Sequence, residues 1–368
     1  MTRLSAHLNS RDNNFNLIRM LSAIAVIFSH SFILAMGPQN GADPLARFIG
    51  MPISALAVNI FFITSGMLVT KSLVDRKSIT FFLVARGVRI FPGLIIAVLF
   101  STYIVGAVTT ELNLFDYILH SDTFSFVKRN IWLFDNVIQY SLPGVFEHTP
   151  YKYAVNGSLW TLPWEIYSYI SVLLIYIVLK KHSNIGFFIS ASFLFLLYFN
   201  GIYRLVDIEI ISPVYLKLLV MFYSGVLFYL LRDKILISWF ILVLSIVLYY
   251  LVNDYKFSKV LFPIFITYWT VCFAYLIKGG VLRYNKLGDL SYGTYIYAFP
   301  VQQALVYYFL PSGWILFWTS TAVTLIFAYI SWHYIEKKAL AHRDRCIILV
   351  ENVALKVSSW FLNLKGNK

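Results

Sequence analysis

The sequence predicts an all-α integral membrane protein, and three observations support this fold class. Apolar side chains make up 59% of the 368 residues and charged side chains only 13%, whereas soluble domains are roughly 45–50% apolar. The apolar residues form runs of about 20, the length at which a helix crosses the hydrocarbon core of a bilayer. Aromatic residues account for 18% of the chain, and Tyr and Trp favour the two lipid–water interfaces.

The apolar segments that are long enough to cross a bilayer predict about ten transmembrane helices. They cover residues 15–36, 49–70, 79–108, 158–179, 185–203, 214–231, 235–252, 259–277, 289–310 and 312–335. An even number of crossings places both termini on one side of the membrane. Lys and Arg are denser in the segments on that same side, which predicts that both termini are cytoplasmic.

Residues 1–336 are predicted to form one transmembrane domain, with two long stretches outside the spans. The outer loop at about 109–157 is rich in aromatic residues. A loop of that length is usually functional or disordered, and its aromatic content favours an ordered cap. Residues 337–368 alternate charged and apolar side chains, which predicts a basic amphipathic tail on the cytoplasmic leaflet.

The formal net charge of +13 does not indicate a nucleic-acid partner. Such a partner needs a basic patch on a water-soluble face, and the chain has no soluble segment large enough to carry one. The lipid bilayer is the predicted surroundings. The two cysteines, Cys272 and Cys346, are predicted to be ordinary thiols, and the spacing of His, Cys and Asp predicts no metal site.

Two ionisable residues lie in the first predicted span, where charge is expensive and is therefore a functional candidate. Arg19 and His30 are about three helical turns apart, so they share one face, with Arg19 near the cytoplasmic end. Alternatively, Arg19 only extends to the inner surface and His30 bonds a neighbouring carbonyl. The pair on one stripe favours a functional role.

Glu165 enters the membrane from the opposite side, in the fourth predicted span. Counted along the two helices, it reaches nearly the depth of His30. A carboxylate and an imidazole at one depth can pair, which lowers the cost of burying each of them. The alternative is a purely structural ion pair that locks two helices together.

Arg86 and Arg89 begin the third predicted span and share a face three residues apart, just before a kink expected at Pro92. Two guanidiniums at the inner mouth of a bundle suit a donor that carries phosphates. They also fit a plain positive-inside anchor. In the ninth span, Gln302 lies about 20 Å from the inner end, where its amide can bind a sugar hydroxyl or a neighbouring helix. Glu336 is predicted to fix the inner end of the tenth span to the basic surface.

Taken together, these segments resemble the acyltransferase-3 family of membrane acyltransferases over nearly the whole chain. Arg19 and His30 fit the family signature of an Arg and a His separated by ten residues. The stretches 61–68, 86–92, 158–167, 291–300 and 335–337 are similar to the family's "FFxxSGxL" helix, its basic third helix, its "SLWxLxxE" segment and its closing motifs. Asn16, Ala298 and Lys338 depart from the residues usual in the family, and the Arg pair is spaced one residue wider.

The resemblance implies an O-acyltransferase that is embedded, with several passes, in the bacterial inner membrane. It implies cytoplasmic acetyl-CoA as the acyl-CoA donor, and as acceptor a glycan or lipid-linked glycan such as O-antigen or another (lipo)polysaccharide. Its expected site residues are His30 and Glu165 for catalysis, Arg19, Arg86 and Arg89 for the donor, and Trp160, Tyr295 and Gln302 for the acceptor. His30 is either a general base or a carrier of the acetyl group, and no metal is required.

A transporter or flippase of lipid-linked glycan is the competing interpretation, because such a protein also has buried charges. Transporters of this kind often carry broken helices at matching positions in two halves of the chain. The sequence contains no such internal symmetry, which favours the enzyme.

Overall fold

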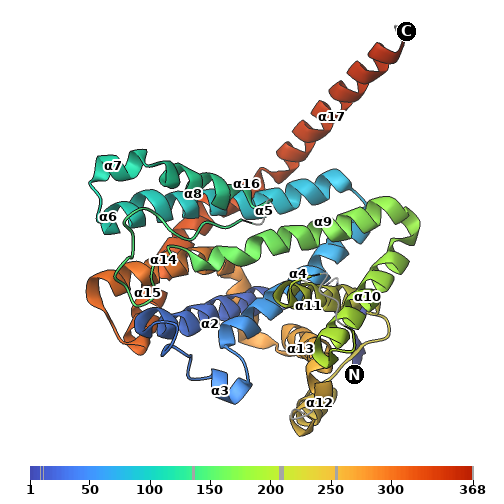
Figure 1. The fold of residues 1–368 in the computed structure, drawn as a ribbon. Coiled ribbons are helices and arrows are strands. Elements are labelled where there is room, and N and C mark those ends of the chain that lie inside the picture. The colour runs from blue at the N-terminus through green and yellow to red at the C-terminus, as the bar shows by residue number, and fades with distance from the viewer. Residues whose placement is uncertain (9, 11, 135–136, 207–210, 253–255, 367–368) are drawn as a thin grey trace.

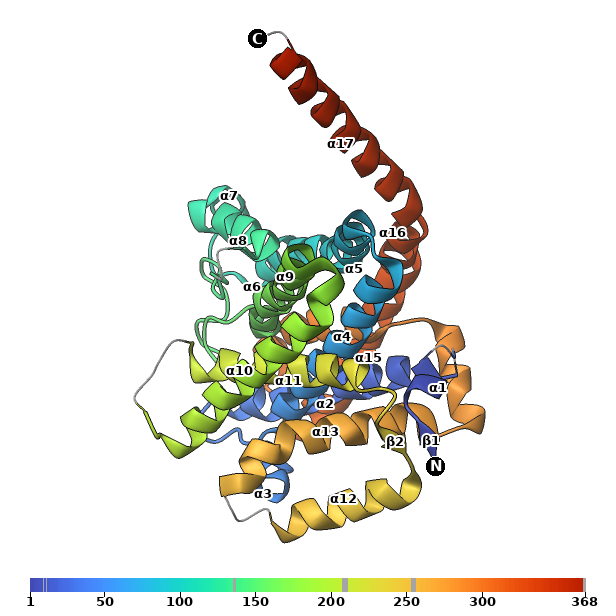
Figure 2. The ribbon, with the colours of Figure 1, turned by 90° about the vertical axis from the view of Figure 1, so that its right-hand side faces the viewer.

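The computed structural model describes residues 1–8, 10, 12–134, 137–206, 211–252 and 256–366, and most of them are helical (Figure 1). The long helices are α2 (Phe15–Met36), α4 (Ile53–Arg76), α5 (Ile79–Leu99), α9 (Leu162–Leu179), α10 (Ser183–Tyr203), α11 (Pro213–Leu230), α13 (Lys256–Leu276), α14 (Ser291–Phe309), α15 (Gly313–Ser331) and α17 (Arg343–Gly366). All but α17 pack into one bundle (Figures 1 and 2).

Shorter elements connect these helices. They are α1 (Ser5–Leu8), α3 (Ala46–Ile49), α6 (Ala107–Thr109), α7 (Leu114–Leu119), α8 (Ser121–Trp132), α12 (Trp239–Leu251), α16 (Lys337–Ala341), the 3₁₀ turns η2 (Gly157–Thr161), η3 (Lys180–His182) and η4 (Gly279–Leu287), and the π-helical turns η1 (Phe100–Gly106) and η5 (Trp332–Glu336). Strands β1 (Thr2–Arg3) and β2 (Leu236–Ile237) pair antiparallel, with Thr2 opposite Ile237.

The fold class is confirmed: the chain is an all-α, multi-pass membrane protein. Among the described residues, seven helical stretches are long and apolar enough to cross a membrane. One of them, Gly157–Tyr203, contains two of the predicted spans, which meet at η3. Helix α12 is shorter than its predicted span, and α14 is helical but is not one of the seven. The number of ten crossings therefore stays a prediction.

Helices α4 and α11 approach each other closely through a pair of glycines. A Cβ atom on Gly66 would overlap the carbonyl oxygen of Phe222, and one on Gly225 would overlap the carbonyl oxygen of Ile63. Small residues allow such close packing of helices in a membrane, where the hydrophobic effect does not drive helices together. The glycine in the segment 61–68 thus fixes α4 on α11, while its neighbour Ser65 lines a cavity.

Helix α14 runs through Pro300, and the carbonyl that this proline leaves without a helical partner anchors the start of the α9 segment. Proline has no N–H, so the carbonyl of Ile296 lacks its usual helical partner. The side-chain amide of Asn156 donates to that carbonyl oxygen at 2.9 Å. The Asn156 Oδ1 atom in turn accepts from the backbone N–H of Ser158 at 3.2 Å, which caps η2. The segment that leads to Glu165 is therefore held against α14.

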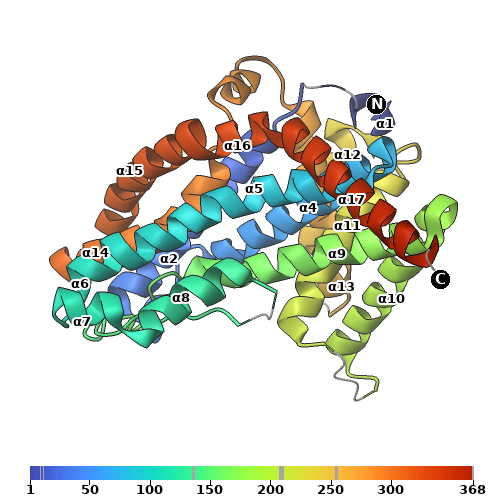
Figure 3. The same ribbon diagram turned by 90° about the horizontal axis from the view of Figure 1, so that it is seen from above.

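The predicted outer loop forms short helices and turns over its described residues, 109–134 and 137–157. Helix α8 folds back along α5 and α9 (Figure 3), and the ring of Phe134 lies 6.4 Å from the ring of Phe91. The hydroxyl of Tyr167 donates to the carbonyl of Phe134 at 2.5 Å. Because Phe91 lies about 18 Å along α5 from its start, this segment enters the bundle. The buried face of α8 explains this position: Thr123, Phe126, Asn130 and Leu133 pack inward.

The tail is helical over its described residues, up to Gly366. Helix α16 follows η5 directly, and α17 projects away from the bundle (Figure 2). The first residue of α17, Arg343, and Leu340 of α16 both line the cavity described below. The tail therefore starts as part of the bundle wall. Its position on the cytoplasmic leaflet stays a prediction.

Candidate active site

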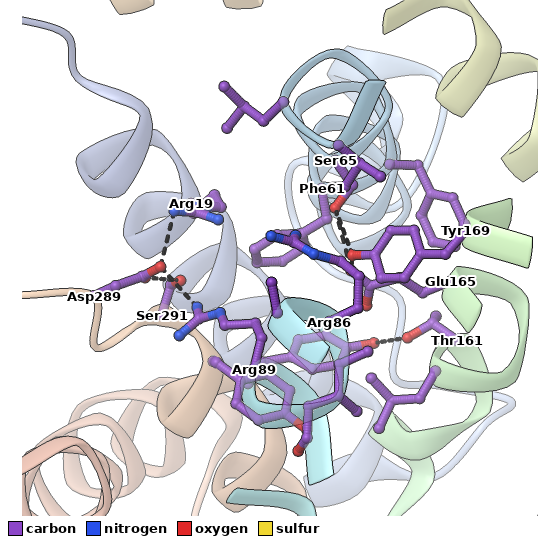
Figure 4. Close-up of a pocket in the computed structure, with 18 of the residues that line it drawn as sticks. Arg19, Phe61, Ser65, Arg86, Arg89, Thr161, Glu165, Tyr169, Asp289 and Ser291 are labelled. Atoms are coloured by element: carbon purple, nitrogen blue, oxygen red, sulfur yellow. Dashed lines mark hydrogen bonds and ion pairs between the residues drawn. The ribbon is translucent and has the colours of Figure 1, made fainter. Parts of the chain in front are cut away.

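A cavity of about 360 Å³ opens between α2, α4, α5, α9 and the start of α14 (Figure 4). Its size falls within the range of small-molecule sites. Five of the predicted site residues share its wall: Arg19, Arg86, Arg89, Glu165 and Tyr295. Other residues that line it include Ser65, Tyr169, Asp289, Tyr292, Trp332, Leu340 and Arg343. The segments that the sequence singled out therefore converge on one site, from four helices.

Two of the arginines are neutralised by carboxylates. Asp289 binds Arg19 at 2.8 Å and Arg89 at 2.7 Å, and Arg89 also reaches Glu336 at 3.4 Å. The hydroxyl of Ser291 donates to the other oxygen of Asp289 at 2.5 Å. We call Arg19, Arg89, Asp289 and Glu336 the ionic network. It links α2, α5, α14 and η5 at one end of the cavity.

Glu336 owes its place in the network to local backbone geometry. It ends the π-helical turn η5, and such turns redirect side chains and recur at functional sites. The hydroxyl of Ser331 donates to Glu336 at 2.9 Å, and the Glu336 side chain is only 2% exposed. Gly93 on α5 leaves room for the neighbouring Tyr292, because a Cβ on Gly93 would lie 2.9 Å from the Tyr292 ring. Glu336 thus fixes the inner end of its helix by binding Arg89 in the cavity wall, not the basic surface.

Arg86 differs from Arg89 in its partners. Among the residues that the structure describes, no carboxylate lies within ion-pair distance of Arg86. Its guanidinium lies 5.8 Å from the ring of Tyr169, across the cavity from the ionic network (Figure 4). A cation–π contact stabilises the guanidinium without neutralising it. Of the predicted arginine pair, Arg86 therefore keeps its positive charge available to a ligand.

Glu165 faces the cavity and is held by hydroxyl groups. Ser65 donates to its carboxylate at 3.2 Å, and the hydroxyl of Tyr169 donates to the same oxygen. Within the described part of the chain, no ion pair joins Glu165 to His30. The expected pairing of the two residues is therefore wrong. The number of residues along each helix predicted the depth of Glu165 and His30 in the membrane. It did not predict the direction in which each side chain points, and this direction decides whether they meet.

His30 is partly buried and lies outside the cavity wall. Its ring meets the edge of the Phe299 ring at a centroid distance of 5.4 Å. The Nδ1 atom is buried and has no hydrogen-bond partner among the described residues. A buried polar atom without a hydrogen-bond partner is unusual in a protein. A substrate that supplies this hydrogen bond when it binds explains such an atom. The Nδ1 atom can accept a hydrogen bond from a substrate hydroxyl.

The backbone turn that carries His30 is clamped from two sides. The side-chain amide of Gln302 on α14 donates to the carbonyl of Ile27 at 2.9 Å and to the hydroxyl of Ser31 at 2.8 Å. On the other side, Ser29 donates to the buried carboxylate of Asp43 at 2.8 Å. We call residues 27–31 the His30 turn. Gln302, predicted to bind the acceptor, uses its amide nitrogen to hold this turn.

One face of α14 connects the cavity to His30. Tyr295 and Phe299 are four residues apart, so their side chains lie one above the other. Tyr295 lines the cavity, shares a hydrogen bond of 2.8 Å with Thr161 and meets the ring of Phe61 at 5.6 Å. Phe299, about one helical turn further on, contacts His30. The distance from the cavity wall to His30 is thus about one turn of a helix.

Residues 12–333 match the sequence profile of an acyltransferase family, described as "Acyltransferase domain". The chain belongs to the acyltransferase-3 family. An "O-acetyl transferase" of Shigella phage Sf6 is 26% identical over 344 residues, which cover 90% of this chain and 96% of that protein. "Nodulation protein 10" of Rhizobium leguminosarum bv. viciae is 24% identical over 369 residues, which cover 93% and 96%. No solved structure matches the chain.

This acyltransferase-3 protein is therefore an O-acyltransferase of a membrane. Three of its motif residues, Arg19, Glu165 and Tyr295, line the cavity. His30, from the same motif as Arg19, lies outside the wall, next to Phe299. Trp160 does not line the cavity and instead packs, partly buried, against the main hydrophobic cluster. Whether it meets the acceptor stays a prediction, as do the roles of the other site residues.

The sequence did not assign roles to several residues that the structure brings to this site. Asp289 stood at the start of the ninth span, at the inner level where Arg19 also lies, and that shared depth was a usable signal. Tyr169 follows Glu165 by one turn, the spacing at which two side chains on a helix meet. No sequence feature indicated that Arg343 belongs to the site, because it lies in the tail, beyond the residues that match the family.

Proposed function

We propose that this acyltransferase moves an acetyl group from cytoplasmic acetyl-CoA to a hydroxyl of a cell-surface glycan. The acceptor class is O-antigen or another (lipo)polysaccharide, presented as glycan or lipid-linked glycan, and the membrane is the bacterial inner membrane. Similarity to a protein named O-acetyl transferase supports the acetyl group. The observation that carries the proposal is the cavity, which holds Arg86 without an ion-pair partner among the described residues and whose wall residue Tyr295 lies one helical turn before Phe299, the neighbour of His30.

The donor would enter from the side on which α5 begins, which the distribution of basic residues assigns to the cytoplasm. Arg86 would bind the pyrophosphate, since a guanidinium matches phosphate oxygens in two parallel hydrogen bonds. Arg19 and Arg89 would add positive potential while the ionic network holds them in place. The thin pantetheine arm would then follow Tyr295 towards His30.

At the transfer step, His30 would act on the acceptor hydroxyl. As a general base it takes the hydroxyl proton while the oxygen bonds to the acetyl carbon; the carbon–sulfur bond breaks, and the CoA thiolate receives the proton. As a nucleophile, His30 would first accept the acetyl group on a ring nitrogen and then pass it to the hydroxyl. An initial burst of CoA release without acceptor would identify the second route.

Glu165 would act beside the reacting atoms through hydroxyl groups, because its carboxylate accepts hydrogen bonds from Ser65 and Tyr169. Trp160 and Tyr295 present aromatic surface, which sugars commonly contact through their apolar faces. The carbonyl oxygen of Gln302 is buried without a partner among the described residues, so it would accept a hydrogen bond from a sugar hydroxyl. No metal enters the proposed reaction.

The test uses the purified protein in lipid nanodiscs with acetyl-CoA and membranes that carry the acceptor. We expect release of free CoA thiol together with acetylation of the glycan, and both should be lost in His30→Ala. NMR of surface glycan from deletion and complemented cells would name the sugar and its hydroxyl. A protein that moves lipid-linked glycan across the bilayer without consuming acetyl-CoA would be a flippase, and this result would refute the proposal.

A further inference from the structure

Arg343 belongs to the wall of the donor cavity although it lies in the tail. It is the first residue of α17 and follows the last residue that matches the family profile, which ends at 333. Together with Leu340 it closes the cavity on the side where α5 begins. Its side chain is 34% exposed, so it is accessible from solvent. The tail therefore adds a guanidinium to a site that the transmembrane helices otherwise form.

A second guanidinium, that of Arg76, lies close to Arg343 at the ring of Phe81. Arg343 lies over the ring of Phe81 at 5.0 Å from its centroid, and Arg76 lies over the same ring at 5.1 Å. Each cation–π contact is favourable, but two like charges near one ring repel each other. Phe81 is about one turn before Ala85 and Arg86 on α5, so this cationic pair lies just outside Arg86.

The carboxylate next to Arg343 is only a weak competitor for a ligand. Asp344 binds Arg343 at 2.9 Å, and its own side chain is 75% exposed. Solvent-exposed ion pairs contribute little free energy. An anion with more charge than a carboxylate can take the place of Asp344. The buried carboxylates of the site, Asp289 and Glu336, are occupied by Arg19 and Arg89.

We propose that Arg343 binds the 3′-phosphate of the CoA donor and that the tail thereby sets the preference for this phosphomonoester. This inference rests on the proposed function. A CoA thioester carries two separate anionic groups, a pyrophosphate and a ribose 3′-phosphate. The cavity offers two guanidiniums that lack a buried carboxylate partner among the described residues, Arg86 inside and Arg343 at its edge. Arg86 takes the inner group and Arg343, supported by Arg76, takes the outer one.

The experiment compares acetyl-CoA with acetyl-dephospho-CoA, which lacks only the 3′-phosphate, using the full-length protein in nanodiscs. The unaltered protein should show a KM about 10-fold lower for acetyl-CoA, the size expected for one charge-assisted contact. In Arg343→Ala the two donors should have equal KM values, with kcat unchanged. Arg345→Ala is the matched control, because Arg345 is an exposed arginine of the same helix and should keep the preference.

The outcomes separate the possible causes. If Arg343→Ala keeps the preference for acetyl-CoA, the inference is wrong although the proposed function stands. If neither donor is consumed by the unaltered protein, the proposed function itself fails. Lipid headgroups are the other source of phosphate, so the assay is run in zwitterionic and in anionic nanodiscs. A loss in Arg343→Ala that is equal for both donors and depends on anionic lipid would assign Arg343 to the membrane surface and overturn the inference.

Discussion

The two ends of the site are built from different chemistry. The ionic network at the start of α14 consists of two guanidiniums and two carboxylates, joined by ion pairs of 2.7 to 3.4 Å. The His30 turn, beside α14, is held by the amide of Gln302, the buried carboxylate of Asp43 and the ring of Phe299. Charge in a membrane is costly unless it is paired. Under the proposed function the two ends are a donor end, where guanidiniums and carboxylates are paired, and a transfer end, where neutral groups and the one carboxylate of Asp43 hold the backbone.

This division has a kinetic consequence. Under the proposed function, residues at the donor end would act on binding and on the stability of the bundle, so changes there should alter the KM for acetyl-CoA or the unfolding temperature. Residues around the His30 turn would act on the reacting atoms, so changes there should alter kcat. Each of the following variants tests whether the two ends separate in this way.

The largest effect is expected for His30→Ala. The variant removes the group that accepts the hydroxyl proton or the acetyl group, so kcat should fall about 100-fold or more, while acetyl-CoA still binds. Initial rates of CoA release and equilibrium binding of acetyl-CoA measure the two quantities. His182→Ala is the control, since His182 lies exposed in the turn between α9 and α10. A folded His30→Ala protein with near-normal rates would show that His30 has no part in the transfer step.

Asp289→Asn should have the next largest effect, and it should fall on stability. The amide leaves Arg19 and Arg89 without their shared carboxylate, and breaking a buried pair costs about 3 kcal/mol. The thermal unfolding of purified protein in detergent should therefore shift to lower temperature. Asp75→Asn provides the control, because the Asp75 side chain, which pairs with Lys71, is 46% exposed and exposed pairs contribute little. Equal shifts in the two variants would show that the ionic network does not hold the bundle.

Much of this organisation could be predicted from the sequence, and the reason is the bilayer. Apolar runs of fixed length identify helices, and charges inside those runs identify the site, so the sequence alone singles out Arg19, Arg86, Arg89 and Glu165. Glycine in the segment 61–68 is recognisable in the sequence only as part of a motif, and its packing role depends on α11. Features contained within one helix, such as its apolar length and the charges inside it, could therefore be predicted.

Features that depend on contacts between distant segments could not be predicted. The sequence did not reveal which arginine stays unpaired, because that is decided by Asp289 and Glu336 from other helices. It paired His30 with Glu165 from depth alone, but the rotation of each helix turns Glu165 towards Ser65 and Tyr169 instead. The return of α8 into the bundle was missed because α8 has one short buried face within a loop that mixes polar and aromatic residues.

Arg86→Ala should have a moderate effect that is confined to the donor. Removing one charge-assisted phosphate contact should raise the KM for acetyl-CoA about 10-fold and leave the unfolding temperature unchanged, because Arg86 has no carboxylate partner in the described part of the chain. Arg89→Ala is the matched variant. It leaves Asp289 and Glu336 partly uncompensated, so the unfolding temperature should fall as well. An Arg86→Ala protein with unchanged KM and reduced kcat would contradict the assignment of Arg86 to the donor.

The smallest effect is expected for Gln302→Leu. This variant tests whether the hydrogen bonds that hold the His30 turn contribute to the transfer step. Leucine keeps the bulk of the side chain but removes the hydrogen bonds to Ile27 and Ser31, each worth about 1 kcal/mol. The His30 turn should loosen, so kcat should fall roughly 5-fold at an unchanged KM for acetyl-CoA. The neighbouring Gln303→Leu is the control at the same depth, since Gln303 bonds the carbonyls of Tyr151 and Ala154 in the outer loop. An equal fall in kcat for Gln303→Leu, or a raised donor KM for Gln302→Leu, would mean that the clamp on the His30 turn has no specific part in the transfer step.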